Sequence, residues 1–382
     1  MALNGNLTGS SQFFSDELFY NGVATQSLRL DDGSNAYLAF TPSSASSAAD
    51  RRKITHSFWI KRGSAATAHT LYSANQNGVD DYYNIQFLAG GTLRLILDVN
   101  DSNFGYATSA VFRDTSAWYN IVFIIDTTQG TDTNRVKLYV NGVLQTIATQ
   151  YSGGHVDQNF STYVMDGNED EIGRFAYNDS TPFDGYMSEV ITTIGQDNTI
   201  GQFGEFKNGI WIAKVYTGSY GANGFRLQFN QVGVGTASTS TIGADTSGNT
   251  NHFTSSGIVA SDCAMPDSPE NNFATLNPLY YLTASTHLSE GNLQLTHEAT
   301  AHRANAGTMF SKTGKWYFEV RNKTDTAGSS VALGVGLQDI TKNLTYSTGD
   351  NNYIYYCNNN SPLTSLNTTT NSLGSFVAGA GD

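Results

Sequence analysis

The chain has 382 residues, of which 14% are charged, and its 33 Asp and Glu against 20 Lys and Arg give a formal net charge of −13. Charge this sparse excludes a long exposed helix or a coiled coil, both of which depend on Glu, Lys and Arg. The 21 Phe and 21 Tyr argue against a disordered chain. An acidic surface repels phosphate, so nucleic acid is a poor candidate partner. Together with the 38 glycines of the chain, this composition favours a soluble β-protein of two or three domains.

The N-terminal residues are polar and glycine-rich, and they have neither the positive charge nor the apolar core of a secretory signal. No apolar run approaches about 18 residues, so we expect no membrane insertion. Residues 1–24 contain one apolar cluster, which is too short to form a core by itself. It is predicted either to pack on the next domain or to dock on a partner, and the docking candidates are Phe13, Phe14, Phe19 and Tyr20.

Residues 25–232 are predicted to form many short strands. Residues 54–61 alternate, with Trp59 on the face opposite Ile54, Phe58 and Ile60. Two apolar runs joined at Gly90–Gly91 predict a hairpin, and the nearly continuous apolar run 118–125 is typical of a strand buried on both faces. The strongest signal is the alternating run 136–140 followed by Asn141-Gly142, a pair that favours a type I′ turn. The pattern predicts an all-β sandwich or jelly roll.

Residues 233–275 change in character, because they are rich in Gly, Ser and Thr and nearly free of large apolar side chains. We expect an inter-domain linker here, partly ordered against the first domain. Strands are expected to resume in residues 276–382, at 314–320 and at 331–337, where apolar side chains alternate again. Apolar content thins after Tyr356, so the second β-sandwich is predicted to be incomplete.

Several short segments occur in the order typical of one lectin family: 58–61, 118–123, 136–143, 171–173 and 183–190. Through them the stretch 25–232 resembles the laminin-G-like, concanavalin A-type lectin/glucanase family. The resemblance implies a jelly-roll sandwich of two antiparallel sheets.

A second resemblance is carried by residues 26–30, 51–53, 183–190, 203–204, 209–214, 216–225, 242–249 and 267–278. These segments are similar to a module that recurs in tailed-phage virion proteins, where a SPRY-like sandwich often follows, and 314–320 with 331–337 is similar to its opening strands. The resemblance implies a virion protein assembled in the host cytoplasm, with other virion proteins as partners. It also implies a homo-oligomer, for which phage fibres suggest a trimer. We expect that no cofactor is required.

Exposed aromatic rings beside polar side chains are the usual means of binding sugars. The sequence predicts such a set in loops of the first domain, comprising Tyr82, Tyr83, Asn100, Asn103 and Tyr106, with Asp80 and Asp81 nearby. The alternative is that these rings cap the rim of the sandwich.

One acidic stretch, residues 166–171, is compatible in composition with two kinds of chemistry. Glycosidases on this fold place paired carboxylates on one strand, but here the middle position is Asn168 and the order differs, so we expect no enzymatic activity. Asp166, Asn168 and Asp170 offer oxygen ligands at alternate positions and are the candidate calcium ligands. The alternative is a solvated polar turn.

The sequence therefore predicts a non-enzymatic structural protein of a phage virion, as a fibre, appendage or decoration subunit, that binds host surface glycans. The sequence is also compatible with two alternatives. One is a glycan depolymerase that uses Asp166, Asp170 or Glu171. The other is an assembly subunit whose sandwiches bind no sugar.

Overall fold

The computed structural model describes residues 19–75, 81–99, 102–149, 154–281, 288–296, 305–309 and 318–321, and four short strands after residue 330. The chain divides into two compact units. The first extends to Phe273 without residues 62–64 and 114–116, and the second comprises those two short pieces and residues from Ala274 onward.

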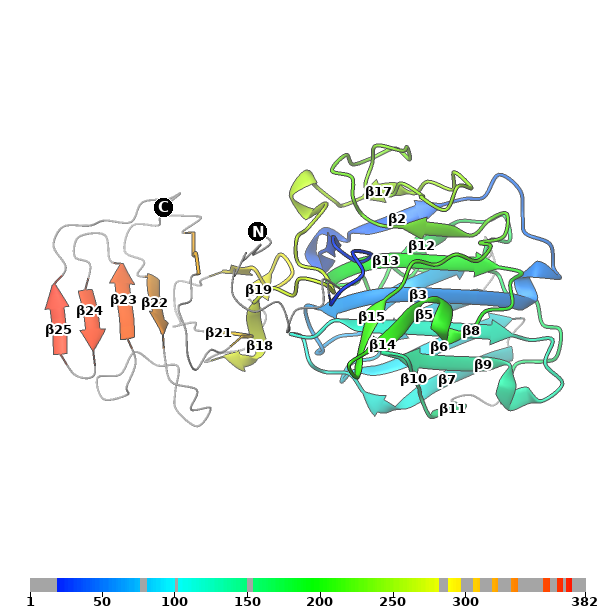
Figure 1. The fold of residues 1–382 in the computed structure, drawn as a ribbon, viewed down its shortest axis with the longest axis horizontal. Helices are drawn as coiled ribbons and strands as arrows, with labels where there is room; N and C mark the ends of the chain where they lie inside the picture. Colours follow the sequence, from blue (N-terminus) through cyan, green and yellow to red (C-terminus); the bar gives the residue numbers. More distant parts are fainter. Residues whose placement is uncertain are drawn as a thin grey trace, which may run out of the picture. The chain divides into compact units, whose positions relative to one another are not determined.

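The first unit is built from two antiparallel sheets (Figure 1). The seven-stranded sheet has the spatial order β1 (Leu28–Leu30), β13 (Gly185–Ile194), β3 (Lys53–Arg62), β8 (Tyr119–Asp126), β9 (Val136–Val140) and β10 (Val143–Leu144), with β16 (Phe225–Leu227) also paired to β13. The eight-stranded sheet has the order β11 (Ile147–Thr149), β7 (Ser102–Val111), β6 (Thr92–Val99), β5 (Tyr82–Phe87), β4 (His69–Asn75), β12 (Asp170–Ile172), β2 (Tyr37–Phe40) and β17 (Thr254–Ser256).

The described residues contain no α-helix, and the helical turns are short 3-10 segments: η1 (Asp32–Ser34), η2 (Asp50–Arg52), η3 (Asp132–Asn134), η4 (Ile200–Gln202) and η5 (Ala260–Asp262). No helix among these residues is long and apolar enough to cross a membrane. The predicted all-β jelly-roll class is thereby confirmed.

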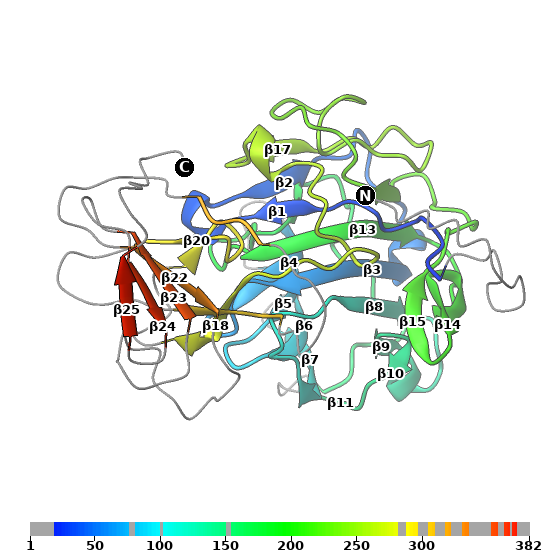
Figure 2. The same ribbon diagram turned by 60° about the vertical axis from the view of Figure 1, so that its left-hand side comes forward.

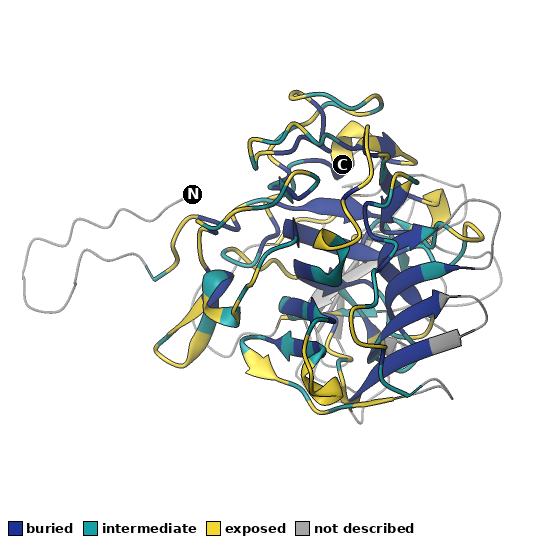
Figure 3. Cartoon of the chain, turned by 90° about the vertical axis from the view of Figure 1, so that its right-hand side faces the viewer, coloured by how far each residue is buried: buried dark blue, intermediate teal, exposed yellow. Residues whose placement is uncertain are grey.

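The main core lies between the two sheets and is supplied by alternate residues of each strand. Phe58 of β3, Ile85 of β5 and Phe123 of β8 are all at most 1% exposed. Burying one such side chain contributes about 1.5–3 kcal/mol. Figure 3 shows the result, with strands mostly in the buried colour and exposed residues gathered on loops and a few edge strands.

The outer face of the seven-stranded sheet is also covered. Trp59 and Trp118 pack there with Tyr186, Ala213 and the N-terminal Val23. Further along, Val122 and Ile191 pack with Phe203 and Tyr216. The segment 199–224 thus forms a partial third layer, and it includes the hairpin of β14 (Gly204–Lys207) and β15 (Ile210–Ala213) (Figure 2). This layer is why β8 is apolar at consecutive positions.

The predicted linker, residues 233–275, is instead part of the first unit as far as Phe273. Strand β17 extends the eight-stranded sheet by pairing with β2, and Ile242 and Phe253 are fully buried in the main core. The polar residues bond to backbone groups: the Asp245 carboxylate accepts from the backbone N–H groups of Arg226, Ser247 and Asn251. The polar composition that suggested a linker therefore has another cause here. The polar side chains form hydrogen bonds with the backbone groups of a long irregular segment.

The second unit contains three small antiparallel sheets among its described residues. Strand β18 (Leu276–Tyr281) pairs with β21 (Asn305–Gly307), and β19 (Leu288–Ser289) pairs with β20 (Gln294–Leu295). A four-stranded meander follows, made of β22 (Val331–Val335), β23 (Tyr353–Cys357), β24 (Leu363–Leu366) and β25 (Thr369–Ser372).

Strand β22 coincides with the predicted strand at 331–337. Of the predicted strand at 314–320, the described residues 318–320 have no strand pairing, and the rest lies outside the described part of the chain. The SPRY-like identification of this unit stays a prediction.

Candidate functional site

The loop between β12 and β13 comprises residues 173–184, and we call it the 173–184 loop. The aromatic and acidic side chains that could recognise a ligand lie in this loop or next to it. Its base is closed by a hydrogen bond from the Phe183 N–H to the Gly173 carbonyl (2.7 Å), and the Thr70 N–H donates to the Thr181 carbonyl (2.8 Å). Gly173 has φ +91°, and a Cβ there would lie 2.9 Å from the Leu30 side chain, so both the backbone and the packing require glycine.

The outer face of the eight-stranded sheet carries polar side chains beside this loop. In β5, Tyr83, Ile85 and Phe87 are fully buried in the core, so alternation assigns Asn84 and Gln86 to the opposite face. Gln86 pairs with Arg94 of β6 in the cross-strand register. The Asn84 side-chain oxygen has no hydrogen-bond partner within the described part of the chain. A buried amide oxygen in this state is expected to bind water or another donor.

Three aromatic rings from two elements meet at the edge of this polar face. The Tyr82 ring lies 4.9 Å from Phe175 and 5.5 Å from Tyr177, measured between ring centroids, and Tyr177 is 39% exposed. The backbone of the loop is held to β4, because Ser73 Oγ donates to the Arg174 carbonyl and accepts from the Ala176 N–H. We call Tyr82, Phe175 and Tyr177 the aromatic group.

Arg174 anchors the start of the loop. Its guanidinium bonds both carboxylate oxygens of Glu171 (2.9 and 2.5 Å) and lies 3.5 Å from the centre of the Tyr37 ring. Burial raises the pKa of Glu171, and the Arg174 partner opposes that shift. The pair is a mostly buried clamp, with Arg174 at 8% and Glu171 at 1% exposure.

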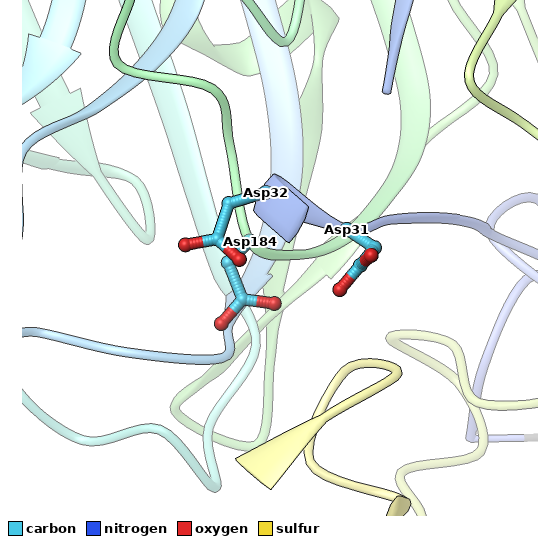
Figure 4. Close-up of side chains that lie close together, drawn as sticks. All are labelled: Asp31, Asp32 and Asp184. Carbon is cyan, nitrogen blue, oxygen red and sulfur yellow. The ribbon is translucent and has the colours of Figure 1, made fainter. Parts of the chain in front are cut away.

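Three carboxylates gather where η1 meets the end of the 173–184 loop (Figure 4). Asp31, Asp32 and Asp184 each place an oxygen within 4.8 Å of the others. Burial, followed by the charge of Asp31, raises the pKa of Asp32. Hard oxygen donors in this arrangement suit a cation such as calcium. The Asp31-Asp32-Gly33 turn is visible in the sequence, but its approach to Asp184 is a tertiary contact.

The predicted glycan residues do not form one exposed set. Tyr82 faces outward in the aromatic group, whereas Tyr83 and Tyr106 are 0% and 2% exposed in the core, where Tyr106 accepts a hydrogen bond from the Val156 N–H. These residues lie in strands β5 and β7 rather than in loops, so consecutive tyrosines point to opposite faces. Asn103 pairs with Asp98 in the backbone register, and Asn100 lies outside the described residues.

The predicted calcium ligands Asp166, Asn168 and Asp170 are separately engaged. Asp166 Oδ1 accepts from the backbone and side-chain nitrogens of Asn168, which forms a local turn. Asp170 is fully buried, and its carboxylate accepts from the Tyr72 hydroxyl and the Met165 N–H. Burial raises the pKa of Asp170 well above its ordinary range. The acidic group that does converge is the one at Asp31, Asp32 and Asp184.

The same geometry bears on the depolymerase alternative. Asp170 and Glu171 are adjacent in β12 and point to opposite faces, Asp170 into the core and Glu171 to its clamp with Arg174. They do not face a common cleft.

Of the predicted docking residues, Phe13 and Phe14 lie outside the described part of the chain. Phe19 and Tyr20 contact each other edge to face at 4.9 Å, and Tyr20 is 37% exposed. The segment that follows belongs to the sandwich: Val23 and Ala24 are buried, and their N–H groups donate to the Glu270 carboxylate.

Comparison with known proteins agrees with this architecture. Residues 32–191 match the family model described as the Concanavalin A-like lectin/glucanases superfamily. No curated protein sequence matches the chain significantly.

Several solved structures are similar to part of the chain. A putative carbohydrate-binding protein from Bacteroides ovatus has a TM-score of 0.42 at 17% identity, covering 62% of this chain and 59% of its own. The Ruminococcus gnavus IT-sialidase CBM40 bound to α2,3-sialyllactose has a TM-score of 0.33 at 16% identity, covering 47% and 94%. Tailspike protein 2 of Escherichia coli O157:H7 bacteriophage CAB120 has a TM-score of 0.33 at 10% identity, covering 46% and 23%.

The prediction that the protein is not an enzyme is corrected by these findings. The matched family model is described as one of lectins and glucanases, so it covers both sugar-binding proteins and enzymes. Because a fold does not fix a function, the lack of a paired-carboxylate motif excludes one catalytic mechanism and does not exclude catalysis in general. By its two sheets, and in agreement with the match over residues 32–191, the first unit has a concanavalin A-like jelly-roll fold.

Proposed function

We propose that the first unit binds a glycan at the aromatic group, and that the chain presents this site on the virion of a tailed phage. The observation that carries the proposal is the placement of the exposed Tyr177 ring next to Tyr82, on the same side of the sheet as Asn84 and Gln86. The virion location rests on the sequence resemblance to tailed-phage modules.

The chemistry of this surface suits a sugar. A pyranose ring has one apolar face of C–H groups, which packs on an aromatic ring, and an equator of hydroxyls, which bond to amides and carboxylates. The 173–184 loop presents its two aromatic rings from a fixed base, since Arg174 is clamped by Glu171 and Ser73. A site held in this way loses little conformational entropy on binding.

Binding should be measured by titrating host surface polysaccharide oligomers into the full chain and into variants of the aromatic group. Tyr177→Ala removes an exposed stacking surface, so affinity should fall by roughly tenfold, which corresponds to about 1.4 kcal/mol. Tyr82→Ala should weaken binding in the same direction. Tyr20→Ala is the matched control, because Tyr20 is as exposed as Tyr177 (37% against 39%) and lies outside this group.

Equal affinity in Tyr177→Ala and the unmodified chain would remove the site from consideration. Binding by none of the proteins would favour an assembly subunit that recognises no sugar. The virion location is tested separately, by a cryo-EM map of the particle in which the first unit is fitted as density.

A further inference from the structure

Lys61, near the end of β3, is an ammonium-bearing side chain that is 1% exposed. Its Nζ lies 2.8 Å from Asp267 Oδ2, 2.8 Å from Asn272 Oδ1 and 2.6 Å from the Phe273 carbonyl oxygen. All three acceptors belong to one short stretch of chain, more than 200 residues further along the sequence. A buried amine is thus held against both a carboxylate and a primary amide.

The carboxylate is itself fixed and shielded. Asp267 is 4% exposed, and its second oxygen accepts from the Trp118 indole N–H (3.0 Å) and the Phe273 N–H (3.3 Å). The Lys61 Nζ lies 5.9 Å from the centre of the Tyr186 ring. Asn272, in contrast, is exposed at the surface. The nucleophile is therefore desolvated, while the amide nitrogen of Asn272 can leave into water.

We propose that Lys61 and Asn272 condense into an intramolecular isopeptide bond, with Asp267 as the acid–base group. Lys61 Nζ donates to Asp267 Oδ2 at 2.8 Å, so this carboxylate is placed to take a proton from the amine along their hydrogen bond. The neutral amine attacks Asn272 Cγ, one bond beyond the 2.8 Å contact with Oδ1.

The step balances without any further reagent. A new Nζ–Cγ bond forms and the Cγ–Nδ2 bond breaks. The proton held by Asp267 goes to the departing Nδ2, the second proton lost by Nζ restores the acid, and one ammonia leaves. No group is oxidised or reduced. Asn272 is the electrophile rather than Asp267, because an amide carbonyl accepts a nucleophile more readily than an ionised carboxylate, and because Asp267 already holds three hydrogen bonds.

The consequence is a covalent closure of the first unit. The bond would tie the end of β3 to the end of the segment that wraps back over the sandwich, enclosing more than 200 residues in a loop. A crosslink over so long a loop restricts the unfolded chain strongly, which raises resistance to unfolding.

The test is the mass of the purified full chain and of its tryptic peptides. The intact mass should be lower than the sequence mass by one ammonia, and a branched peptide should contain both Lys61 and Asn272, since trypsin does not cleave after an acylated lysine. Lys61→Arg keeps the positive charge and should restore the full mass, as should Asn272→Ala and Asp267→Asn. Asn271→Ala is the matched control and should still lose ammonia.

An intact mass equal to the sequence mass, with cleavage after Lys61, would overturn the proposal and leave a buried ion pair. Loss of ammonia without the branched peptide would also overturn it, since that result means a succinimide at an asparagine and no crosslink. A link to Asp267 with loss of water would reject the assignment to Asn272. If Lys61→Arg fails to fold, the mass of Asn272→Ala still tests the proposal, because this variant leaves the Lys61–Asp267 ion pair intact. The thermal midpoint of Asn272→Ala should lie below that of Asn271→Ala.

Discussion

His56 shows how strongly a single residue depends on its surroundings here. Its ring is fully buried between the sheets, 4.4 Å from the Tyr72 ring, and Nδ1 lies 2.9 Å from Thr192 Oγ1. Burial lowers the pKa of His56 from 6.5 to about 3. The sequence places His56 in a strand, but it does not show that the ring enters the core as a neutral group.

This burial predicts acid sensitivity. Between pH 6.5 and 3 the unfolded chain binds a proton at His56 that the folded chain does not, so the histidine's contribution is complete above pH 6.5 and declines as pH falls. The difference in unfolding free energy between the natural chain and His56→Phe should fall with acid by up to about 1.4 kcal/mol per pH unit. Urea denaturation across this range measures it.

Thr192→Val is the control for this experiment, because it removes the hydroxyl partner and retains the histidine. Its pH profile should run parallel to that of the natural chain. Parallel profiles for His56→Phe and the natural chain would mean that His56 binds its proton equally well in the folded and unfolded states.

At the scale of elements, two Asn-Gly turns share nearly the same backbone. Asn141-Gly142 has φ of 48° and 75°, and Asn208-Gly209 has φ of 51° and 79°. The first joins β9 to β10, as the sequence predicts, and the second joins β14 to β15. Their surroundings differ: a Cβ on Gly142 would lie 2.3 Å from the Trp211 ring, whereas a Cβ on Gly209 would meet nothing within 4 Å.

Gly142→Ala and Gly209→Ala should therefore separate backbone strain from packing. Both changes place a side chain at positive φ, which costs about 1–2 kcal/mol. Gly142→Ala should cost a further 1–3 kcal/mol or so, because Trp211 must move from its contact with the turn and its hydrogen bond to Asn120. Unfolding midpoints in denaturant measure both. An equal loss of unfolding free energy in the two variants would show that the Trp211 ring can move aside without a measurable cost.

At the scale of the molecule, the first unit depends on the chain that follows its last long strand. Besides β17 and the buried Phe253, the segment up to Phe273 contributes Asp262, which pairs with the buried Arg29, and Asp267, which pairs with Lys61. Leaving one member of such a pair without its partner costs about 3–5 kcal/mol.

Truncation tests this dependence. A chain ending at Phe273 should unfold cooperatively, with native-like near-UV circular dichroism. A chain ending at Val232, the domain boundary that composition favours, should be insoluble or unfolded. It exposes core residues, and it leaves the buried Arg29 and Lys61 without their carboxylate partners. A cooperative transition in the shorter chain would show that 233–273 is a dispensable linker after all.

The sequence by itself determined strands β3, β8 and β9, the hairpin at Gly90–Gly91 and the turn at Asn141-Gly142, because alternation and turn chemistry are local. Tertiary structure decided which face of each strand is covered, and so it buried Tyr83 and left Tyr82 outside. It also brought together Asp31 with Asp184 and Lys61 with Asn272. No local sequence pattern encodes these two contacts. Their partners lie about 150 to 210 positions apart, and they come together only when the two sheets and the segments that cover them pack.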